Sequence, residues 1–213
     1  MIKIKDVTYS YNGTPVITEL SFSFLSSNIY TIIGENGSGK TTLLRLILGL
    51  LKPERGSIQF VEEAIISYLP DHNGLYEDLS ITDNIRFRLA LYKQSFSTIQ
   101  NEYYSLLNKY HLYDKRDEPI SSLSLGMKKK AAIIATTLVH ANVYIFDEPT
   151  GGIDHDAKIE IISLFKEIDL KQKCILIVTH DEELLSEVPS VLLKMQEGRL
   201  MEWKHCISSW KKN

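Results

Sequence analysis

Alternation of apolar and polar side chains at the start of the chain predicts an antiparallel hairpin. Residues 2–9 alternate between the two kinds of side chain, and residues 16–25 form a second run of the same type. The dipeptide Asn12-Gly13 lies between the runs, and it favours tight turns whose two central residues both have positive φ. The chain is therefore expected to begin as antiparallel β-sheet.

Beyond this hairpin the pattern changes to short buried strands separated by helices. Continuous apolar, β-branched runs indicate the strands, and apolar residues three and four positions apart indicate the helices. Strands that alternate with helices form parallel sheets. The expected strands are 29–33, a short one within 50–60 after a turn, 64–70, 143–146 and 174–178, and the expected helices are 43–51 and about 156–169.

One long stretch interrupts this alternation. From Asp71 to about Val139 the pattern is helical, and Ser80 or Thr82 is expected to cap the first helix. We therefore predict an α/β fold in a single domain covering 1–213. It has an N-terminal antiparallel β subdomain, a parallel-sheet core and an inserted α-helical subdomain at about 71–139.

The sequence GENGSGKTT, residues 34–42, fits the pattern G-x-x-x-x-G-K-[ST] of a phosphate-binding loop. Its glycines let backbone N–H groups and a helix N-terminus converge on phosphate oxygens. Lys40 is expected to reach the β and γ phosphates, and the Thr41 hydroxyl is expected to bind Mg²⁺. The loop therefore predicts a nucleoside triphosphate site whose contacts are Gly34, Glu35, Asn36, Gly37, Ser38, Gly39, Lys40, Thr41 and Thr42.

Two later strands end in residues that suit the same chemistry. The run VYIFDEPT delivers Asp147 to the carboxyl edge of the sheet, where a carboxylate can hold Mg²⁺, and Glu148 follows it directly. A carboxylate in that place can act as the general base that activates a water. The run ILIVTH brings His180 to the same edge, where it can contact the γ phosphate or orient the water.

Composition narrows the classes of partner. The 213 residues carry a formal net charge of -3, which provides no overall basic field for nucleic acid, so no nucleic-acid partner is expected. The most apolar stretch, 43–51, is too short to span a bilayer and contains Arg45. The three lysines at 128–130 are interpreted as a solvated helix face. Cys174 and Cys206 lie too far apart to suggest a metal site or disulfide framework, and Cys174 is expected to be buried.

The motifs in their order closely resemble the ATP-binding subunits of ABC transporters. They are GENGSGKTT, SSLSLGMKK, VYIFDEPTGGID and ILIVTHD, and the resemblance covers nearly the whole chain. The second is the most specific, because 123–127 occupies the signature position, normally LSGGQ. The resemblance implies a P-loop NTPase fold with a RecA-like core, ATP and Mg²⁺ as ligands, and ATP hydrolysis coupled to transport.

The resemblance also assigns roles to single residues. Tyr11 resembles the aromatic residue that stacks on adenine, and Asp154 resembles the D-loop aspartate. Glu148 resembles the catalytic base, and His180 the switch histidine. In this family two subunits face head to tail, which implies that Ser124 and Gly126 of one close over the γ phosphate held by Lys40 of the other.

The resemblance further implies partners and a location. A homodimer or heterodimer of ATPase subunits would drive a transmembrane permease that is a separate chain, so the protein would be cytoplasmic and peripheral on the cell membrane. The SLGMK form of the signature, with Leu125 and Met127, looks like the branch of drug, bacteriocin and antibiotic-resistance exporters. Two alternatives remain open: a soluble ABC ATPase outside transport, and a weakly active regulatory partner in a heterodimer.

Asp71 departs from the family pattern because it stands where a Q-loop glutamine is expected. Its carboxylate would be a charged and shorter Mg²⁺ ligand. The alternative is that Asp71 caps the helical block or forms an Asx-turn with His72 and Asn73. The expected metal-binding residues are thus Thr41, Asp147 and Asp71.

Overall fold

A hairpin opens the three-stranded antiparallel sheet of the computed structural model, which describes residues 2–61 and 63–203. Strands β1 (Ile2–Tyr11) and β2 (Thr14–Phe24) are joined at Asn12 and Gly13, whose φ angles are 50° and 80°. Strand β4 (Arg55–Phe60) pairs with the other edge of β1. The predicted hairpin is confirmed, and it gains a third strand.

The second sheet has six strands in the order β5-β6-β7-β3-β8-β9. All neighbours are parallel except β8 and β9, which are antiparallel. The parallel strands at the centre are confirmed at the predicted places, whereas the sequence pattern did not predict β8 and β9. The strands are β3 (Asn28–Ile33), β5 (Ile66–Leu69), β6 (Val143–Asp147), β7 (Cys174–Val178), β8 (Val191–Gln196) and β9 (Arg199–Glu202).

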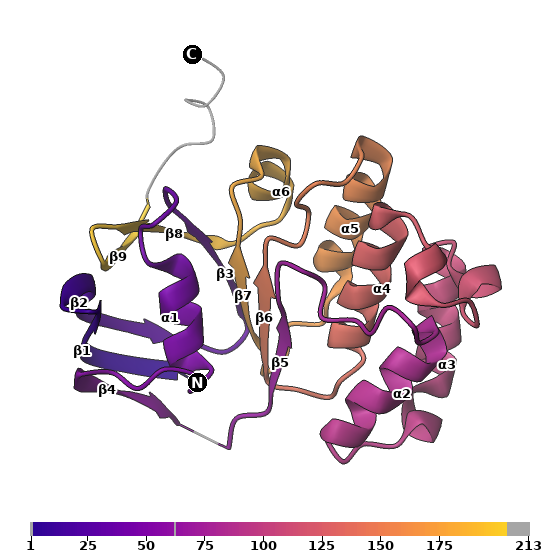
Figure 1. Ribbon diagram of the computed structural model, residues 1–213, viewed down its shortest axis with the longest axis horizontal. Coiled ribbons are helices and arrows are strands. Elements are labelled where there is room, and N and C mark those ends of the chain that lie inside the picture. The colour runs from indigo at the N-terminus through magenta and orange to yellow at the C-terminus, as the bar shows by residue number, and fades with distance from the viewer. Residues whose placement is uncertain (1, 62, 204–213) are drawn as a thin grey trace.

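Successive residues of the central strands point into two different cores. In β6, Val143 and Ile145 belong to the core shared with the three-stranded sheet, while Tyr144 and Phe146 belong to the core under the long helices. A strand covered on both faces is apolar at every position, which is why no alternation marks it in the sequence. Helix α1 (Lys40–Ile47) lies between the two sheets (Figure 1).

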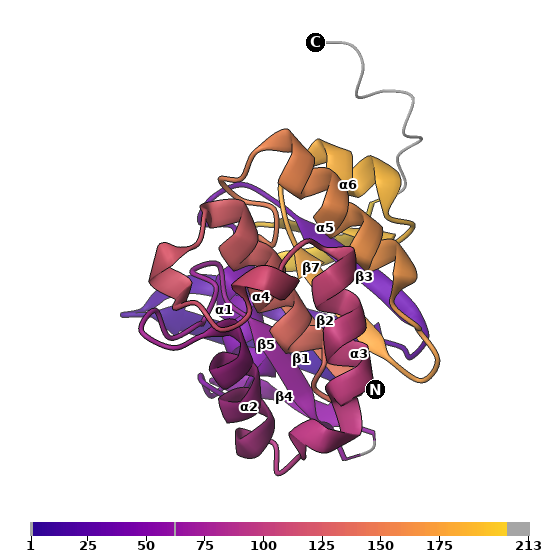
Figure 2. The ribbon, with the colours of Figure 1, turned by 90° about the vertical axis from the view of Figure 1, so that its right-hand side faces the viewer.

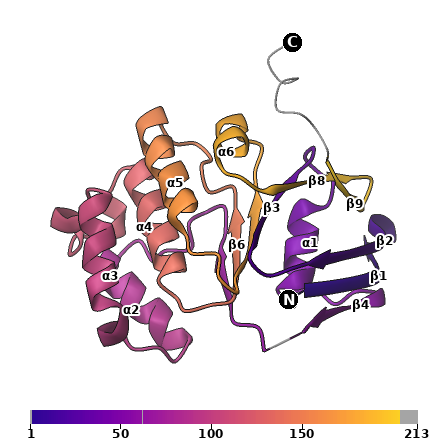
Figure 3. The same cartoon turned by 180° about the vertical axis from the view of Figure 1, so that it is seen from behind.

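Most of the helices lie on the other face of the six-stranded sheet. Figure 3 shows α4 and α5 next to that face and α2 and α3 farther from the sheet, and Figure 2 shows these helices from their own side. The helices are α2 (Ile81–Leu91), α3 (Phe96–Lys109), α4 (Leu125–Thr137), α5 (His155–Glu167) and the short α6 (Glu182–Glu187), with 3₁₀ turns at Tyr113–Lys115 and Ile120–Ser122. In the described ranges, the structure contains no helix with the length and apolar character needed to cross a bilayer.

Both predicted ends of the helix after the phosphate loop are wrong. Helix α1 starts at Lys40 rather than at 43, because Gly39 is its N-cap and the polar residues that follow form the first turn, and it ends at Ile47 rather than at 51. In the interval that begins at Asp71, the first helix starts at Ile81, as predicted. Its cap is Ser80, as expected, since the Ser80 hydroxyl accepts a hydrogen bond from the Asp83 N–H at 3.0 Å.

The interpretation of the lysine run as a solvated face is also wrong. Lys129 and Lys130 are only 3% and 7% exposed, because α4 packs against β5, α2 and α5. Each ammonium is compensated by carbonyl or carboxylate oxygens. Cys174 is buried as expected, and burial raises the pKa of its thiol to about 12. The expectation for Cys206 falls outside the described residues.

Candidate functional site

The phosphate-loop sequence lies between β3 and α1, the context that the motif requires. Gly39, the N-cap of α1, has φ of 104°, a left-handed conformation that favours glycine. Because glycine provides no side-chain acceptor, the first-turn N–H groups of α1 are left for an anion. The Lys40 ammonium donates to the carbonyls of Gly34 at 2.7 Å and Glu35 at 2.9 Å, so it lies folded over its own loop.

A cavity of about 490 Å³ lies beside this loop at the carboxyl ends of β5 and β6. Tyr11 contributes to one wall, where its ring is 39% exposed and packs edge-on against Tyr9 at a centroid distance of 5.0 Å. The cavity unites most of the residues predicted to bind the nucleotide and metal. These are Tyr11, Asn36, Gly37, Gly39, Lys40, Thr41, Thr42, Asp71, Asp147 and Glu148.

Asp147 ends β6 and is almost completely buried at the cavity wall, with 6% of its surface exposed. Burial, reinforced by the negative charges of Asp71 and Glu148, raises the pKa of the Asp147 carboxyl to about 6. The positive charges of Lys40 and Lys129 oppose this shift. A carboxylate whose charge is disfavoured in this way gains from a nearby cation, which suits a metal ligand.

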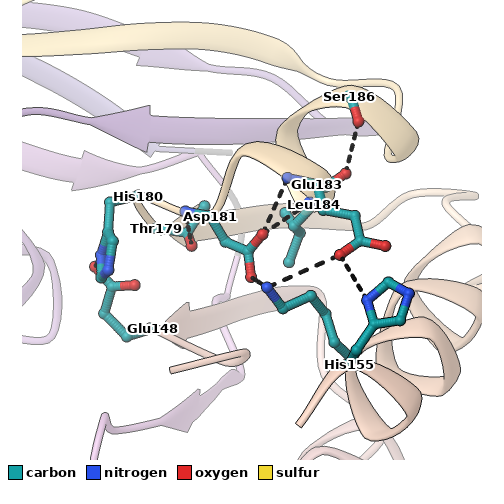
Figure 4. Close-up of polar contacts among 9 residues, drawn as sticks. Glu148, His155, Thr179, His180, Asp181, Glu183, Leu184 and Ser186 are labelled. Carbon is teal, nitrogen blue, oxygen red and sulfur yellow. Dashed lines mark hydrogen bonds and ion pairs between the residues drawn. The ribbon is translucent and has the colours of Figure 1, made fainter. Parts of the chain in front are cut away.

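Glu148 has an unusual backbone for a residue with a side chain, with φ of 48°. Its N–H donates to the Val178 carbonyl at 2.8 Å, and its carbonyl accepts from the Gly151 N–H at 3.2 Å. The Oε1 atom lies 2.9 Å from Nδ1 of His180, as Figure 4 shows. The structure therefore brings together the two residues that the sequence predicted at the ends of separate strands.

The residue after His180 anchors this part of the chain. Asp181 caps α6 by accepting hydrogen bonds from the N–H groups of Glu183 at 3.0 Å and Leu184 at 3.3 Å (Figure 4). Its Oδ2 atom also lies 2.9 Å from Nζ of Lys158 on α5. The backbone beside the His180 ring is thus fixed to two helices.

Asp71 lies in the loop after β5 and lines the cavity with Asp147, although its side chain is 70% exposed. Its Oδ1 atom lies 3.1 Å from Nδ1 of His72, and the Asn73 N–H donates to the Pro70 carbonyl. The cap expected of Asp71 is provided by Ser80 instead, and the Asn73 N–H that an Asx-turn would use donates to the Pro70 carbonyl. Asp71 therefore remains free to turn toward the cavity.

Ser124 and Gly126, predicted to act on a facing subunit, and Asp154, predicted to bind the nucleotide, do not line this cavity. Ser124 caps α4, where its hydroxyl accepts from the Met127 N–H at 3.3 Å. Asp154 caps α5 by accepting from the Ala157 N–H at 2.9 Å. Gly126 is buried against Ala157. Their contacts in a single chain are thus helix caps and helix packing.

Several residues in or next to the cavity escaped the sequence reasoning. Arg45 lies one helical turn after Thr41, so helix periodicity could have identified it, and Tyr68 lies on β5. His72 also lines the cavity. Lys129, which contacts the backbone of Asp71 and Glu148, gave no such signal because it belongs to a run of lysines.

Comparison with known proteins agrees with this geometry. The sequence model of the ABC transporter family matches residues 17–151. The zinc import ATP-binding protein ZnuC of Buchnera aphidicola subsp. Baizongia pistaciae is 34% identical over 84% of this chain and 74% of its own length. The SkfA peptide export ATP-binding protein SkfE of Bacillus subtilis is 28% identical over 95% and 88%.

Solved structures agree as well. The structure of cbiO1 from Clostridium perfringens, part of the ABC transporter complex cbiONQ, superposes with a TM-score of 0.77 at 28% identity, covering 94% of this chain and 86% of that one. An ATP-binding subunit of an ABC transporter, 24% identical and covering 95% and 90%, shares the fold with a TM-score of 0.82. The chain thus belongs to the ABC transporter family, as an ATPase subunit that uses ATP and Mg²⁺ to energise a permease.

Proposed function

We propose that this chain powers an exporter and that two ATPase subunits close head to tail around two MgATP. The observation that carries the proposal is a division of the predicted machinery. Lys40, Asp147 and Glu148 line one cavity, whereas Ser124 and Gly126 lie outside it at the start of α4. A site divided in this way is completed by a second subunit.

Within the cavity, the residues from Gly34 to Thr42 would hold the phosphates. Backbone N–H groups of the loop and the N-terminus of α1 are suited to phosphate oxygens. The Lys40 ammonium would exchange its two carbonyl partners for the β and γ phosphates, and both are charge-assisted contacts. Tyr11, half-exposed at the wall, offers its ring to the adenine.

Thr41, Asp147 and Asp71 would hold Mg²⁺, and their oxygens fit a hard cation. The support is the raised pKa of the buried Asp147, because a cation restores the charged form that burial disfavours. When bound, Mg²⁺ neutralises charge on the β and γ phosphates.

We assign the activation of water to Glu148, with His180 as its orienting partner. The carboxylate can take the proton from a water that attacks the γ phosphate. His180 holds one carboxylate oxygen at 2.9 Å, which leaves the second oxygen for the water. The shared cavity wall supports this role because it places Glu148 next to Asp147 and Lys40.

The facing subunit would supply Ser124, Gly126 and Asp154. Leu125 is 48% exposed at the start of α4, so this helix end is accessible to a second molecule. A hydroxyl and a helix N-terminus are good donors to a phosphate. The partner would be either a second copy of this chain or a related ATPase subunit.

Export and the permease contact complete the proposal. The support for export is the SLGMK signature. Of the relatives described above, one is a zinc import protein and another is a peptide export protein. We propose that the permease is a separate chain, and that 1–213 is a single ATPase domain with an inserted helical subdomain at about 71–139. Co-expression with any multi-span protein encoded beside this gene, followed by transport assays in vesicles, tests the permease partner and the direction of transport.

Size-exclusion chromatography of Glu148→Gln tests the paired site directly. This variant is expected to elute as a dimer with MgATP and as a monomer without it, because the nucleotide is bound and not consumed. Glu148→Gln combined with Lys40→Ala is the matched control, and it should stay monomeric because the main phosphate donor is lost. ATP-independent elution of the single variant, or dimerisation of the double variant, would overturn the proposal.

A further inference from the structure

Lys129 is a buried cation on α4 that contacts backbone on two other elements. Its Nζ atom donates to the Asp71 carbonyl at 2.6 Å and to the Glu148 carbonyl at 3.1 Å. Burial lowers the pKa of this ammonium, and the nearby carboxylates of Asp71, Glu148 and Asp147 counteract that effect. One side chain therefore joins α4 to the loop after β5 and to the end of β6.

The Glu148 end of this contact lies where the backbone needs support. A positive φ is unfavourable for a residue with a side chain, so the surroundings must hold it in place. Three described hydrogen bonds do so: to the Val178 carbonyl, from the Gly151 N–H and from Lys129. The bond from Lys129 is charge-assisted, and such bonds are about twice as strong as neutral ones.

The direction of the Glu148 side chain follows from that backbone. If the residue relaxed to a negative φ, its Cβ would point elsewhere and the 2.9 Å contact with His180 would be lost. Misplacement of a reacting group by about 1 Å can cost 10²-fold in rate. A contact that fixes this φ therefore affects turnover more than nucleotide binding.

We propose that Lys129 is a positioning residue for ATP hydrolysis, which holds the backbone of Glu148 and Asp71 to α4 and so directs the Glu148 carboxylate. Ser124 caps the start of the same helix. Lys129 therefore connects the site of its own subunit to the helix start that we propose contacts the nucleotide of the facing subunit. This inference rests on the proposed role of Glu148 as the base.

Lys130 provides a matched control on the same helix. It is 7% exposed, and its Nζ atom donates to the Tyr110 carbonyl at 3.0 Å and to Glu160 at 2.6 Å. Neither partner lines the cavity. Lys129→Met and Lys130→Met thus each remove one buried ammonium, and only the first removes a contact to the site.

Steady-state ATPase kinetics and thermal melting of both variants test the inference. Lys129→Met is expected to lose roughly 10- to 100-fold in kcat while KM for ATP changes less than about threefold. Lys130→Met should keep kcat despite a comparable fall in Tm. Lys129→Arg, which can still donate to both carbonyls, should recover most of the rate. If Lys129→Met does not fold, Lys129→Gln, a shorter neutral donor, replaces it with the same expectation.

A double variant separates this inference from the proposed function. Lys129→Met added to Glu148→Gln should cause no further loss of residual turnover, because the lysine acts through the carboxylate. An unchanged kcat in Lys129→Met, equal losses in both lysine variants, or a further loss in the double variant would each overturn the role of Lys129. Wild-type turnover in Glu148→Gln would instead overturn the role of Glu148 itself.

Discussion

Glu148 and His180 meet at 2.9 Å because they follow neighbouring parallel strands of the sheet. In the register of β6 and β7, Asp147 lies opposite Val178, so the residues after each strand emerge at the same edge. A carboxylate and an imidazole separated by 32 positions in the chain thus form a hydrogen-bonded pair. Glu148 lines the cavity that contains Lys40, and it lines a neighbouring pocket together with His180.

Glu148→Gln is expected to reduce kcat by roughly 10²- to 10⁴-fold, because the amide keeps the shape of the side chain without its proton affinity. ATP affinity should stay within a few-fold of that of the wild type. His180→Ala leaves the carboxylate but frees its orientation, so its loss should be smaller. Phosphate release measures kcat, and binding of a fluorescent ATP analogue measures the affinity for ATP. A larger loss in His180→Ala than in Glu148→Gln would contradict the assigned roles.

Asp71 gives a prediction on metal dependence. Its exposed carboxylate lines the cavity, and we expect it to enter the Mg²⁺ shell in the closed ATP state, directly or through a water. Asp71→Ala should then raise the Mg²⁺ concentration needed for half-maximal ATPase activity, while Asp71→Gln should retain much of the activity because its carbonyl oxygen can also coordinate. An unchanged Mg²⁺ dependence in Asp71→Ala, with only a lower Tm, would remove Asp71 from the metal site.

Two of the strands predicted from sequence, β6 and β7, are buried on both faces. β6 and β7 are apolar at every position except the last residue of β6, and such a run is distinctive without any knowledge of its neighbours. β8 and β9 are only partly buried, contain polar residues and are separated by a tight turn. The start of α1 was missed because its first turn is polar, which reflects its place at the phosphate loop.

In the candidate site, motifs predicted single residues but not all of their contacts. The position of Lys40 beside Asp147 depends on the strand order β6-β7-β3, which no local pattern specifies. Lys129 shows the limit most clearly. A run of lysines has the same sequence whether its ammonium groups face water or backbone carbonyls, and only the packing of α4 decides between them.

Asp181 gives a prediction on acid stability. Burial raises the pKa of its carboxyl, but the hydrogen bond and positive charge of Lys158, with the Thr150 side chain and the Leu184 N–H, lower it by more, so the pKa lies below the usual value. A depressed folded pKa stabilises the fold fully above the unfolded pKa of about 3.9, and this contribution is lost as the pH falls through the folded pKa. The contact should therefore weaken only in acid.

Urea unfolding of Asp181→Asn measures this contribution. Asparagine can still cap α6 but loses the ion pair, so the free energy of unfolding at pH 7 should fall by about 1–3 kcal/mol. The difference from the wild type should shrink below about pH 4. Asp154 also caps a helix, and its described contacts include no lysine. Asp154→Asn should therefore lose less free energy of unfolding at pH 7 than Asp181→Asn. A difference for Asp181→Asn that is equal at pH 3 and pH 7 would contradict this assignment.

Gly126 makes the last prediction, because α4 and α5 approach each other closely at this residue. A Cβ placed on Gly126 would lie 2.7 Å from Cβ of Ala157 and 3.4 Å from Oδ2 of Asp154. Two opposing effects follow for Gly126→Ala. Alanine is a better helix former by about 1 kcal/mol, but overpacking costs typically 1–3 kcal/mol. The nearest atom is a Cβ fixed to the α5 backbone, so the clash cannot be relieved by a rotamer change, and we expect net destabilisation.

The exchange variant Gly126→Ala with Ala157→Gly distinguishes packing from nucleotide binding. Moving the methyl group from α5 to α4 removes the clash, so the free energy of unfolding should return to within about 1 kcal/mol of the wild type. If Gly126 also lets the start of α4 approach a phosphate across the dimer, the exchange variant should be stable yet lose ATP-driven dimerisation in the Glu148→Gln background. A single Gly126→Ala variant as stable as the wild type would show that helix propensity outweighs the contact. Stability and dimerisation both restored in the exchange variant would make Gly126 a packing residue alone.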